Sequence, residues 1–474
     1  MNDSMAPDTH RRKKLTNLLR PRRSRVFSMA LGVVLVSVPL LGAAQETPLT
    51  LEHLIQRALE ENPQLGVARA TSDAAGFRLE QSRASYYPRL SLDTRLEQAT
   101  LNANSPRETL PFLDFGGTQV PVVNPEEDMS GFRRTFVSLS AEYLLYDFGR
   151  RASTVKIGEE NLGSAQASLA KSINETILAV SAAYFGALRA QELAEVERQS
   201  LKRQQEALRI SKTLHAAGRG TASDIARAEA DLARAELSLV QAKNEVGLSQ
   251  LALRRAVGLS PDGEPLRLAK TSRLKEPSGL DKGVQELIEH ALELRPELAA
   301  QQRIIAVSSA TVAKERAEYF PVLNLFGNYN VQQYEDVDSS PNYTVGVQMS
   351  WQIYDGALRR NRVGEAKARL VQEQDRLRDA TLGVATDVRD AYQRFLEAKE
   401  QLQVTAKVIK ASELDLKLAR KGYKEGIRMI YDLSTADTNY RNAKAQGVMA
   451  EYNLQNAIAK LYWALGSIAN VVHK

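Results

Sequence analysis

Apolar residues recur along this chain with two different periods, and the two periods follow each other in the same order twice. Long stretches have apolar residues three and four positions apart, which is the pattern of helices with one buried face. Between them lie short stretches in which apolar and polar residues alternate, and this pattern predicts strands with one apolar face. The alternation is clearest at Val137, Leu139, Ala141, Tyr143 and Leu145, and again at Val345, Val347, Met349, Trp351 and Ile353.

The two halves of the chain are copies of one unit. The segment LIQRALEENPQL resembles LIEHALELRPEL, which follows it by 233 positions. Later in each half, a shift of 208 positions pairs matching residues without a gap; the pairs include Tyr184 with Tyr392, Gly218 with Gly426, Asp224 with Asp432 and Gly258 with Gly466. This internal duplication predicts two structural repeats, over residues 45–275 and 276–474.

Each repeat is predicted to contain a short helix, a medium helix, two strands, a very long helix and, after a glycine, a last helix. In the first repeat the helices are expected at about 50–61, 64–86, 149–215 and 222–257, and the strands at about 89–98 and 135–146. In the second repeat the helices are expected at about 284–294, 297–319, 357–423 and 430–465, and the strands at about 322–333 and 343–354. The fold class is therefore mainly α with a small β part.

The long and last helices carry apolar heptads rich in alanine, which predicts coiled coils whose helices approach closely. At ~1.5 Å per residue the long helix is ~100 Å long, and the medium and last helices together reach ~90 Å. Stacked end to end, those two helices can pair with the long helix along its whole length. A solid coiled-coil rod without a lumen fits the same periodicity.

The predicted strands allow two interpretations. A half-buried antiparallel sheet explains the alternation. The strands are also about 10 residues long, which suffices to cross a bilayer at a tilt, and aromatic residues gather at their helix-side ends as at a membrane interface. These aromatic residues are Tyr86, Tyr87, Tyr146, Tyr319, Phe320, Trp351 and Tyr354. Four strands cannot close a barrel, and open sheet edges are not stable in lipid, so a spanning sheet requires several chains to share one barrel.

Residues 1–44 have the order of a secretory signal peptide, with basic residues, an apolar run and small residues before Gln45. The segment holds 8 of the 63 basic and 2 of the 57 acidic residues, so its expected removal leaves 55 of each. A chain without excess positive charge is not expected to bind nucleic acid. The sequence contains no cysteine, which excludes disulfides and a lipid-anchor cysteine.

No arrangement of residues typical of catalysis is present. The five histidines are scattered, and no phosphate-binding glycine loop occurs. The acidic run Glu126-Glu127-Asp128 lies in a long polar loop over about 99–134, where solvated charge is a simpler interpretation than a cation site. We therefore expect no enzymatic activity, no cofactor, and no catalytic or metal-binding residues.

The duplication, the short alternating strands and the ~100 Å helices together resemble the TolC family of outer-membrane efflux channels. The resemblance implies a homotrimer, in which three chains supply twelve strands to one transmembrane β-barrel and twelve helices to a hollow α-barrel in the periplasm. It also implies an exit duct for drugs, other small molecules or secreted proteins. An inner-membrane efflux or ABC-type transporter and a periplasmic adaptor would deliver this cargo. Members of the family have no enzymatic activity.

The segment YKEGIRMIYDLSTAD matches the periplasmic tip at which family members close the tunnel. The resemblance implies that Tyr423 and Arg428 bond to a hydroxyl residue and an aspartate of the first hairpin, which correspond to Ser223 and Asp224. Asp432 matches a carboxylate that rings the constriction. Like charges in such a ring raise carboxylate pKa values and favour cations in the pore.

The turns at Gly218-Arg219 and Gly426-Ile427 match the tips that contact the adaptor. Two features depart from the family pattern. A second gate aspartate is often found where this chain has Thr435, so the resemblance implies a weaker or absent cation-binding ring. The tip sequences also differ from the usual Val-Gly-Leu or Val-Gly-Thr, so they do not identify the adaptor.

Helix capping explains the same tip residues without a gate, because glycine ends one helix and Ser223 or Asp224 starts the next. The two roles are compatible. For the whole chain, the alternative function is a periplasmic coiled-coil scaffold or adaptor without a pore. A duct requires detergent for its extraction, whereas a scaffold is released by osmotic shock.

Overall fold

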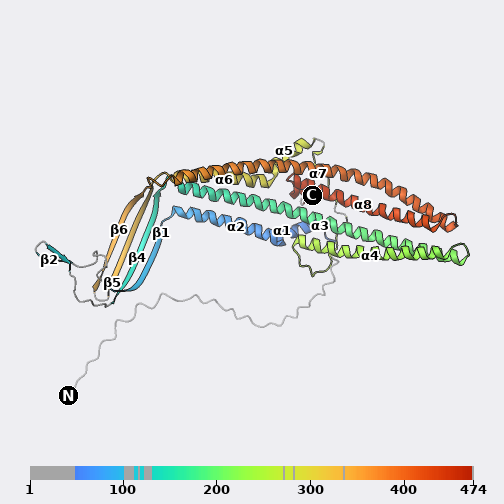
Figure 1. Ribbon diagram of the computed structural model, residues 1–474, viewed down its shortest axis with the longest axis horizontal. Coiled ribbons are helices and arrows are strands. Elements are labelled where there is room, and N and C mark those ends of the chain that lie inside the picture. The colour runs from blue at the N-terminus through green and yellow to red at the C-terminus, as the bar shows by residue number, and fades with distance from the viewer. Residues whose placement is uncertain are drawn as a thin grey trace, which may run out of the picture. The chain divides into compact units, whose positions relative to one another are not determined.

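The computed structural model describes residues 48–100, 112–115, 118–121, 131–270, 273–280, 283–334 and 337–471. The expected signal peptide over residues 1–44 and the acidic run at 126–128 lie outside the described residues. The described chain consists of helices, a four-stranded sheet and a short two-stranded hairpin (Figure 1).

The order of helices and long strands is the same in both halves. The first half contains α1 (Leu51–Glu61), α2 (Pro63–Arg83), η1 (Ala84–Tyr86), β1 (Arg89–Thr100), β4 (Gly131–Tyr146), α3 (Arg150–Ala216) and α4 (Ala222–Val257). The second half contains α5 (Val284–Leu294), α6 (Pro296–Ala317), β5 (Val322–Tyr334), β6 (Val337–Ser350), α7 (Leu358–Glu425), α8 (Ile430–Ala464) and η4 (Ile468–Val471). The short hairpin, β2 (Phe112–Phe115) and β3 (Thr118–Pro121), lies within the long loop of the first half. Each predicted helix is found within a few residues of its expected bounds.

Local sequence explains where several helices begin. The side chain of Thr50 accepts a hydrogen bond from the backbone N–H of His53 at the start of α1. Asn62 does the same for Gln64 at the start of α2, where Pro63 occupies the first turn. Such residues satisfy backbone N–H groups that have no partner inside the helix.

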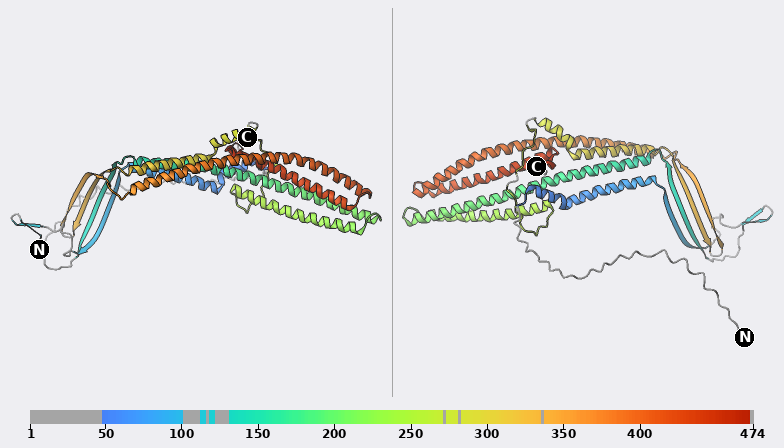
Figure 2. Two further views of the ribbon diagram at one scale, coloured as in Figure 1. Left: turned by 45° about the horizontal axis from the view of Figure 1, so that its top comes forward. Right: turned by 180° about the vertical axis from the view of Figure 1, so that it is seen from behind.

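The long helix α3 is the centre of the helical part. It lies between α2 and α4 on one side and α6 and α8 on the other, and α7 packs against α6 and α8 (Figures 1 and 2). The predicted stacking of the medium and last helices along the long helix is therefore confirmed.

The joint between α2 and α4 depends on a glycine. Gly258 has a φ of +95°, and a Cβ at this position would lie 2.8 Å from the Cα of Asn62. The Asn62 Nδ2 donates to the carbonyl oxygen of Ala256 at 2.8 Å. The turn after α4 thus contacts the corner between α1 and α2 at a distance that only glycine permits.

The four-stranded sheet has the order β1-β4-β5-β6, and all neighbouring strands are antiparallel. The register places Leu92 opposite Leu139, and Leu139 opposite Tyr329, so the alternating apolar residues share one face. Most side chains on this face are solvent-exposed in the single chain, and those of the outer strands most strongly; Leu90 is 73% and Val345 is 71% exposed, while Val137 and Tyr143 on β4 are half-buried. The interpretation as a half-buried sheet therefore does not describe this chain by itself.

The last strand ends earlier than predicted. β6 stops at Ser350 rather than near residue 354. Ser350 pairs with Val322, the first residue of β5. The residue before Val322, which would continue the pairing, is Pro321. Proline has no N–H group to continue the ladder. Trp351 instead donates its Nε1–H to the carbonyl oxygen of Tyr319 at 3.1 Å.

Buried apolar residues form three clusters along the helices. One includes Tyr184 and Phe185 and joins α1, α3 and α4, and a second includes Phe395 and joins α5, α7 and α8. The third lies near the hairpin tips and includes Ile210 and Leu433. In the part of the chain that the structure describes, no helix combines the length and the hydropathy needed to cross a membrane.

Candidate functional site

The tips of the two helical hairpins have the same backbone conformation. Gly218 follows α3 and Gly426 follows α7, and their φ angles are +71° and +79°. In both turns the next residue, Arg219 or Ile427, donates its backbone N–H at 2.8 Å to a carbonyl group of the last helical turn. This is the geometry of a glycine-terminated helix, which other residues adopt at a cost.

Both aspartates of the expected gate cap the helices that follow the turns. Asp224 Oδ2 accepts from the backbone N–H of Thr221 at 2.9 Å, and Thr221 Oγ1 accepts from the backbone N–H of Asp224 at 3.2 Å. Asp432 Oδ2 accepts from the backbone N–H of Met429 at 3.2 Å. Each carboxylate also faces the positive end of a helix dipole. The capping role is thus present for both residues, and Ser223 lies exposed beside them.

Tyr423 is buried between the hairpins and is only 5% exposed. Its hydroxyl lies 2.7 Å from the Oγ of Ser211, which is also buried. Burial raises the pKa of Tyr423; the hydrogen bond to Ser211 partly offsets this, and the charge of Asp224 adds to it. The partner of Tyr423 within this chain is therefore Ser211 of α3 and not Ser223.

Within the part of the chain that the structure describes, Arg428 forms its ion pair inside the second hairpin and none with the first. Its Nη1 lies 3.7 Å from Asp415 Oδ1, and both side chains are about half exposed, so this ion pair is weak. Its alkyl chain packs over Gly422, where a Cβ would lie 2.9 Å from the Arg428 Cγ. Within the described residues of one chain, neither Tyr423 nor Arg428 is hydrogen-bonded to the expected hydroxyl–aspartate pair.

The two tips nevertheless contact each other. Arg219 Nη2 donates to the carbonyl oxygen of Glu425 at 2.9 Å. Farther from the tips, Ser434 Oγ donates to Asp231 Oδ2 at 2.6 Å and so joins α8 to α4. The second tip presents apolar surface to solvent, since Ile427 is 78% exposed.

A buried carboxylate that no sequence pattern indicates also joins the hairpins. Asp437 of α8 is 4% exposed and accepts hydrogen bonds from three side chains of α3. The donors are Arg203 Nε at 2.5 Å, Gln204 Nε2 at 2.8 Å and Ser200 Oγ at 3.5 Å. These four residues are called the Asp437 cluster below. Because Asp437 and Arg203 are 234 positions apart, no local pattern indicates their pairing.

The seven aromatic residues expected at a membrane interface lie where helices meet the sheet, and all seven are exposed. Phe148 joins them without having been predicted. Its ring lies 4.7 Å from that of Tyr146, edge to face, and 4.9 Å from that of Phe320, stacked. Aromatic pairs prefer these two arrangements. The alternating pattern does not indicate Phe148, because this residue follows its end.

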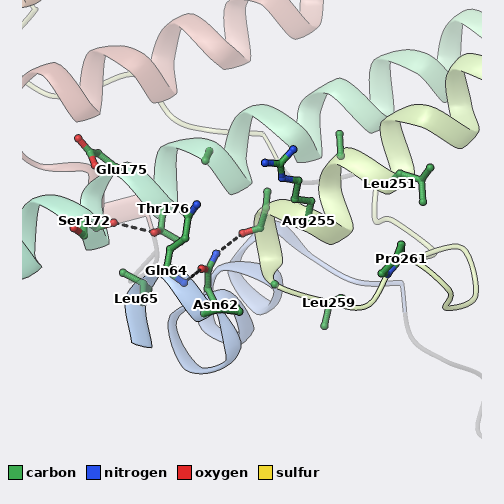
Figure 3. A pocket seen from close by; sticks show the side chains of 15 residues that line it. Asn62, Gln64, Leu65, Ser172, Glu175, Thr176, Leu251, Arg255, Leu259 and Pro261 are labelled. Atoms are coloured by element: carbon green, nitrogen blue, oxygen red, sulfur yellow. Dashed lines mark hydrogen bonds between the residues drawn. The ribbon is translucent and has the colours of Figure 1, made fainter. Parts of the chain in front are cut away.

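A cavity of about 950 Å³ lies at the joint of α1, α2, α3 and α4 (Figure 3). Asn62 and Arg255 both line it. At the matching joint of the second half, Arg295 occupies the position of Asn62 and Trp463 that of Arg255. The guanidinium carbon of Arg295 lies 4.1 Å from the centroid of the Trp463 ring. The two joints therefore match in position but differ in packing.

The comparisons with known proteins cover both halves of the chain. The family model for outer membrane efflux proteins matches residues 54–259 and 287–467. The outer membrane protein TolC of Vibrio cholerae is 24% identical over 431 residues, which are 88% of this chain and 91% of that protein. The pyoverdine export outer membrane protein OpmQ of Pseudomonas aeruginosa is 26% identical over 422 residues, which are 88% of this chain and 85% of that protein.

The fold is also that of solved outer-membrane channels. The structure of the outer-membrane channel OprN superimposes with a TM-score of 0.73 at 23% sequence identity, over 88% of this chain and 90% of that one. The family match spans most of the sequence. The chain therefore belongs to the outer membrane efflux protein family, the family of TolC.

Proposed function

We propose that three copies of this chain form an exit duct through the outer membrane and across the periplasm. The observation that carries the proposal is the sheet, whose apolar face is exposed and whose outer strands, β1 and β6, each pair on one side only within the described chain. An exposed apolar face is unfavourable in water, and an open edge is unfavourable in lipid. Three copies would supply four strands each; a closed barrel of these twelve strands has no open edge, and in the membrane its apolar face contacts lipid and not water.

The helices supply a second argument for assembly. Apolar side chains are exposed on α4 and on α7; they are Leu237, Val240, Leu248 and Leu251, and Val404, Val408, Leu414 and Leu418. Within the described residues, α3 has partner helices on both sides, whereas α7 packs along its length on α6 and α8, with smaller contacts to α5 and, at the tip, to α3. The α2 and α4 helices of a second copy would cover the free side of α7, and three such contacts would close a cylinder of twelve helices.

The hairpin tips are proposed to close the periplasmic end of this cylinder. The Tyr423–Ser211 hydrogen bond holds α7 against α3 within each copy. Arg428, Ser223 and Asp224 would then contact one another between neighbouring copies, since Arg428 bonds to neither of the other two within the described residues of one copy. Asp432 would form a ring of three carboxylates, which repel one another and attract cations. Thr435 leaves this ring without a second acidic layer.

The exposed tips are also the proposed contact with a periplasmic adaptor. Gly218 and Gly426 set the turns, and Arg219 and Ile427 present a cation and an apolar side chain to a partner. An inner-membrane transporter, of the efflux or ABC type, would deliver drugs, other small molecules or secreted proteins. Export by the relative OpmQ supports small-molecule cargo.

Fractionation of cells that express the chain tests this proposal. We expect the protein in the outer membrane, extracted only by detergent, with a native mass three times that of the chain. Release of a soluble protein by osmotic shock would instead favour a periplasmic coiled-coil scaffold or adaptor.

A further inference from the structure

The Asp437 cluster joins the two hairpins of one chain and is separate from the residues assigned to the gate. The Asp437 side chain is 6% and the Arg203 side chain 17% exposed, so their ion pair is largely shielded from water. Arg203 binds the Oδ1 atom and Gln204 binds the Oδ2 atom, so both carboxylate oxygens are used. All donors belong to α3 and the acceptor belongs to α8. The cluster therefore fixes one position of α8 relative to α3.

The cluster and the Tyr423–Ser211 bond both adjoin one apolar core, of which Tyr423 is itself a member. Ile210 of α3 and Leu433 of α8 belong to this core, and Ile210 lies between Arg203 and Ser211 in sequence. On α3, Ser211 follows Arg203 by eight residues, which is ~12 Å along a helix. The second hairpin is thus attached to α3 at two levels.

The first hairpin has a different arrangement at the matching positions. By the shift of 208 positions, Glu229 matches Asp437 and Ala411 matches Arg203. Glu229 is exposed and its nearest cation is Lys212, at 3.2 Å. The buried ion pair is therefore a property of the contact between the two hairpins of one chain, and duplication alone does not explain it.

A buried ion pair favours one arrangement more than it adds stability. Its attraction is largely offset by the loss of hydration, but separating the partners leaves each charge buried without a counter-charge. A movement that slides or lifts α8 from α3 separates Asp437 from Arg203. The pair therefore opposes small displacements of the second hairpin.

We propose that the Asp437 cluster is a second closing contact of the resting duct, which holds α8 against α3 together with Tyr423 until the tips open. This inference rests on the proposed function, because a closing contact requires a channel. Asp437 and Arg203 act as positioning residues for the tip helices.

The direct test is Asp437→Asn in the full protein, purified in detergent and inserted into a planar bilayer. We expect the resting open probability to rise on the order of tenfold or more, because Arg203 loses its counter-charge. Asp437→Glu keeps the charge and is expected to remain near the wild type. Glu229→Gln, at the matching position of the first hairpin, is the control and should have no effect. The melting temperature of each variant separates closing from stability, since a role in folding alone would lower it without changing the open probability.

Three results would overturn the inference, and they can be distinguished. An unchanged open probability in Asp437→Asn, with a raised one in Tyr423→Phe, would exclude the second closing contact and leave the duct. Absence of current from the wild type and from both variants would contradict the duct itself. If Asp437→Asn fails to assemble, Gln204→Leu keeps the ion pair and removes one neutral donor. It should raise the open probability about threefold, and no rise would contradict the proposal.

Discussion

Replacing Tyr423 by phenylalanine should open the resting duct without disturbing the fold. The variant loses the 2.7 Å hydrogen bond to Ser211 but keeps the ring that packs in the tip core. Ser211 still donates to the carbonyl oxygen of Ala207 at 3.0 Å, so no buried donor is left without a partner. The change therefore removes one contact between the hairpins and creates no cavity.

The size of the effect depends on how the three copies move. A buried neutral hydrogen bond contributes about 1 kcal/mol. If each copy opens independently, the ratio of its open to its closed population rises roughly fivefold. If the three copies open together, the contributions add to about 3 kcal/mol, and the ratio of open to closed channels rises roughly a hundredfold. The measured ratio thus reports on cooperativity as well as on the bond.

Single-channel recording of the purified variant measures this ratio. Tyr431→Phe is the matched control, because Tyr431 lies on the same tip but is exposed. Adding Arg428→Ser removes a proposed contact between copies and should widen the resting pore further. Resting openings of Tyr423→Phe equal to those of the wild type, in protein with unchanged thermal stability, would refute the assignment of Tyr423 to the gate.

Two further predictions concern the helical part. Gly258→Ala brings a Cβ within 2.8 Å of the Asn62 Cα at a φ of +95°, so thermal unfolding should show a loss of about 2–4 kcal/mol; Gly186→Ala, with open space around its Cβ, should instead stabilise by roughly 0.5–1 kcal/mol. The hydrogen bond from Lys156, followed by that from Arg303, lowers the pKa of Glu160 below its ordinary value of 4.5. The ionised Glu160 therefore contributes its full stability above pH 4.5, and this contribution is lost as the pH falls through the lowered pKa. In Glu160→Gln, the free energy of unfolding should fall less between about pH 6 and pH 3 than it does in the wild type. The same pH dependence in both proteins would contradict this role of Glu160.

The helix bounds could be predicted because local signals mark them. Proline at Pro63 and Pro296 opens two helices, and glycine at Gly218 and Gly426 closes two others. Because of the duplication, each helix boundary occurs in both halves, so a boundary predicted in one half can be compared with its counterpart in the other. The end of β6 was less predictable, because it depends on where its partner β5 begins.

The contacts between the hairpins could not be predicted from local patterns. Heptads indicate that a helix has a buried stripe, but they do not say which polar residue of one stripe faces which residue of another. Ser211 meets Tyr423 across 212 positions, and Arg203 meets Asp437 across 234. The register of α3 against α7 and α8 brings these residues together, and this register is known only from the folded chain.

The conductance of the detergent-purified wild-type protein in a planar bilayer shows whether the chain forms a duct. We expect small, discrete current steps from a pore with a narrow resting mouth, and larger steps after Tyr423→Phe is combined with Arg428→Ser. A folded and inserted protein that passes no current, either as the wild type or as this double variant, would contradict the exit duct.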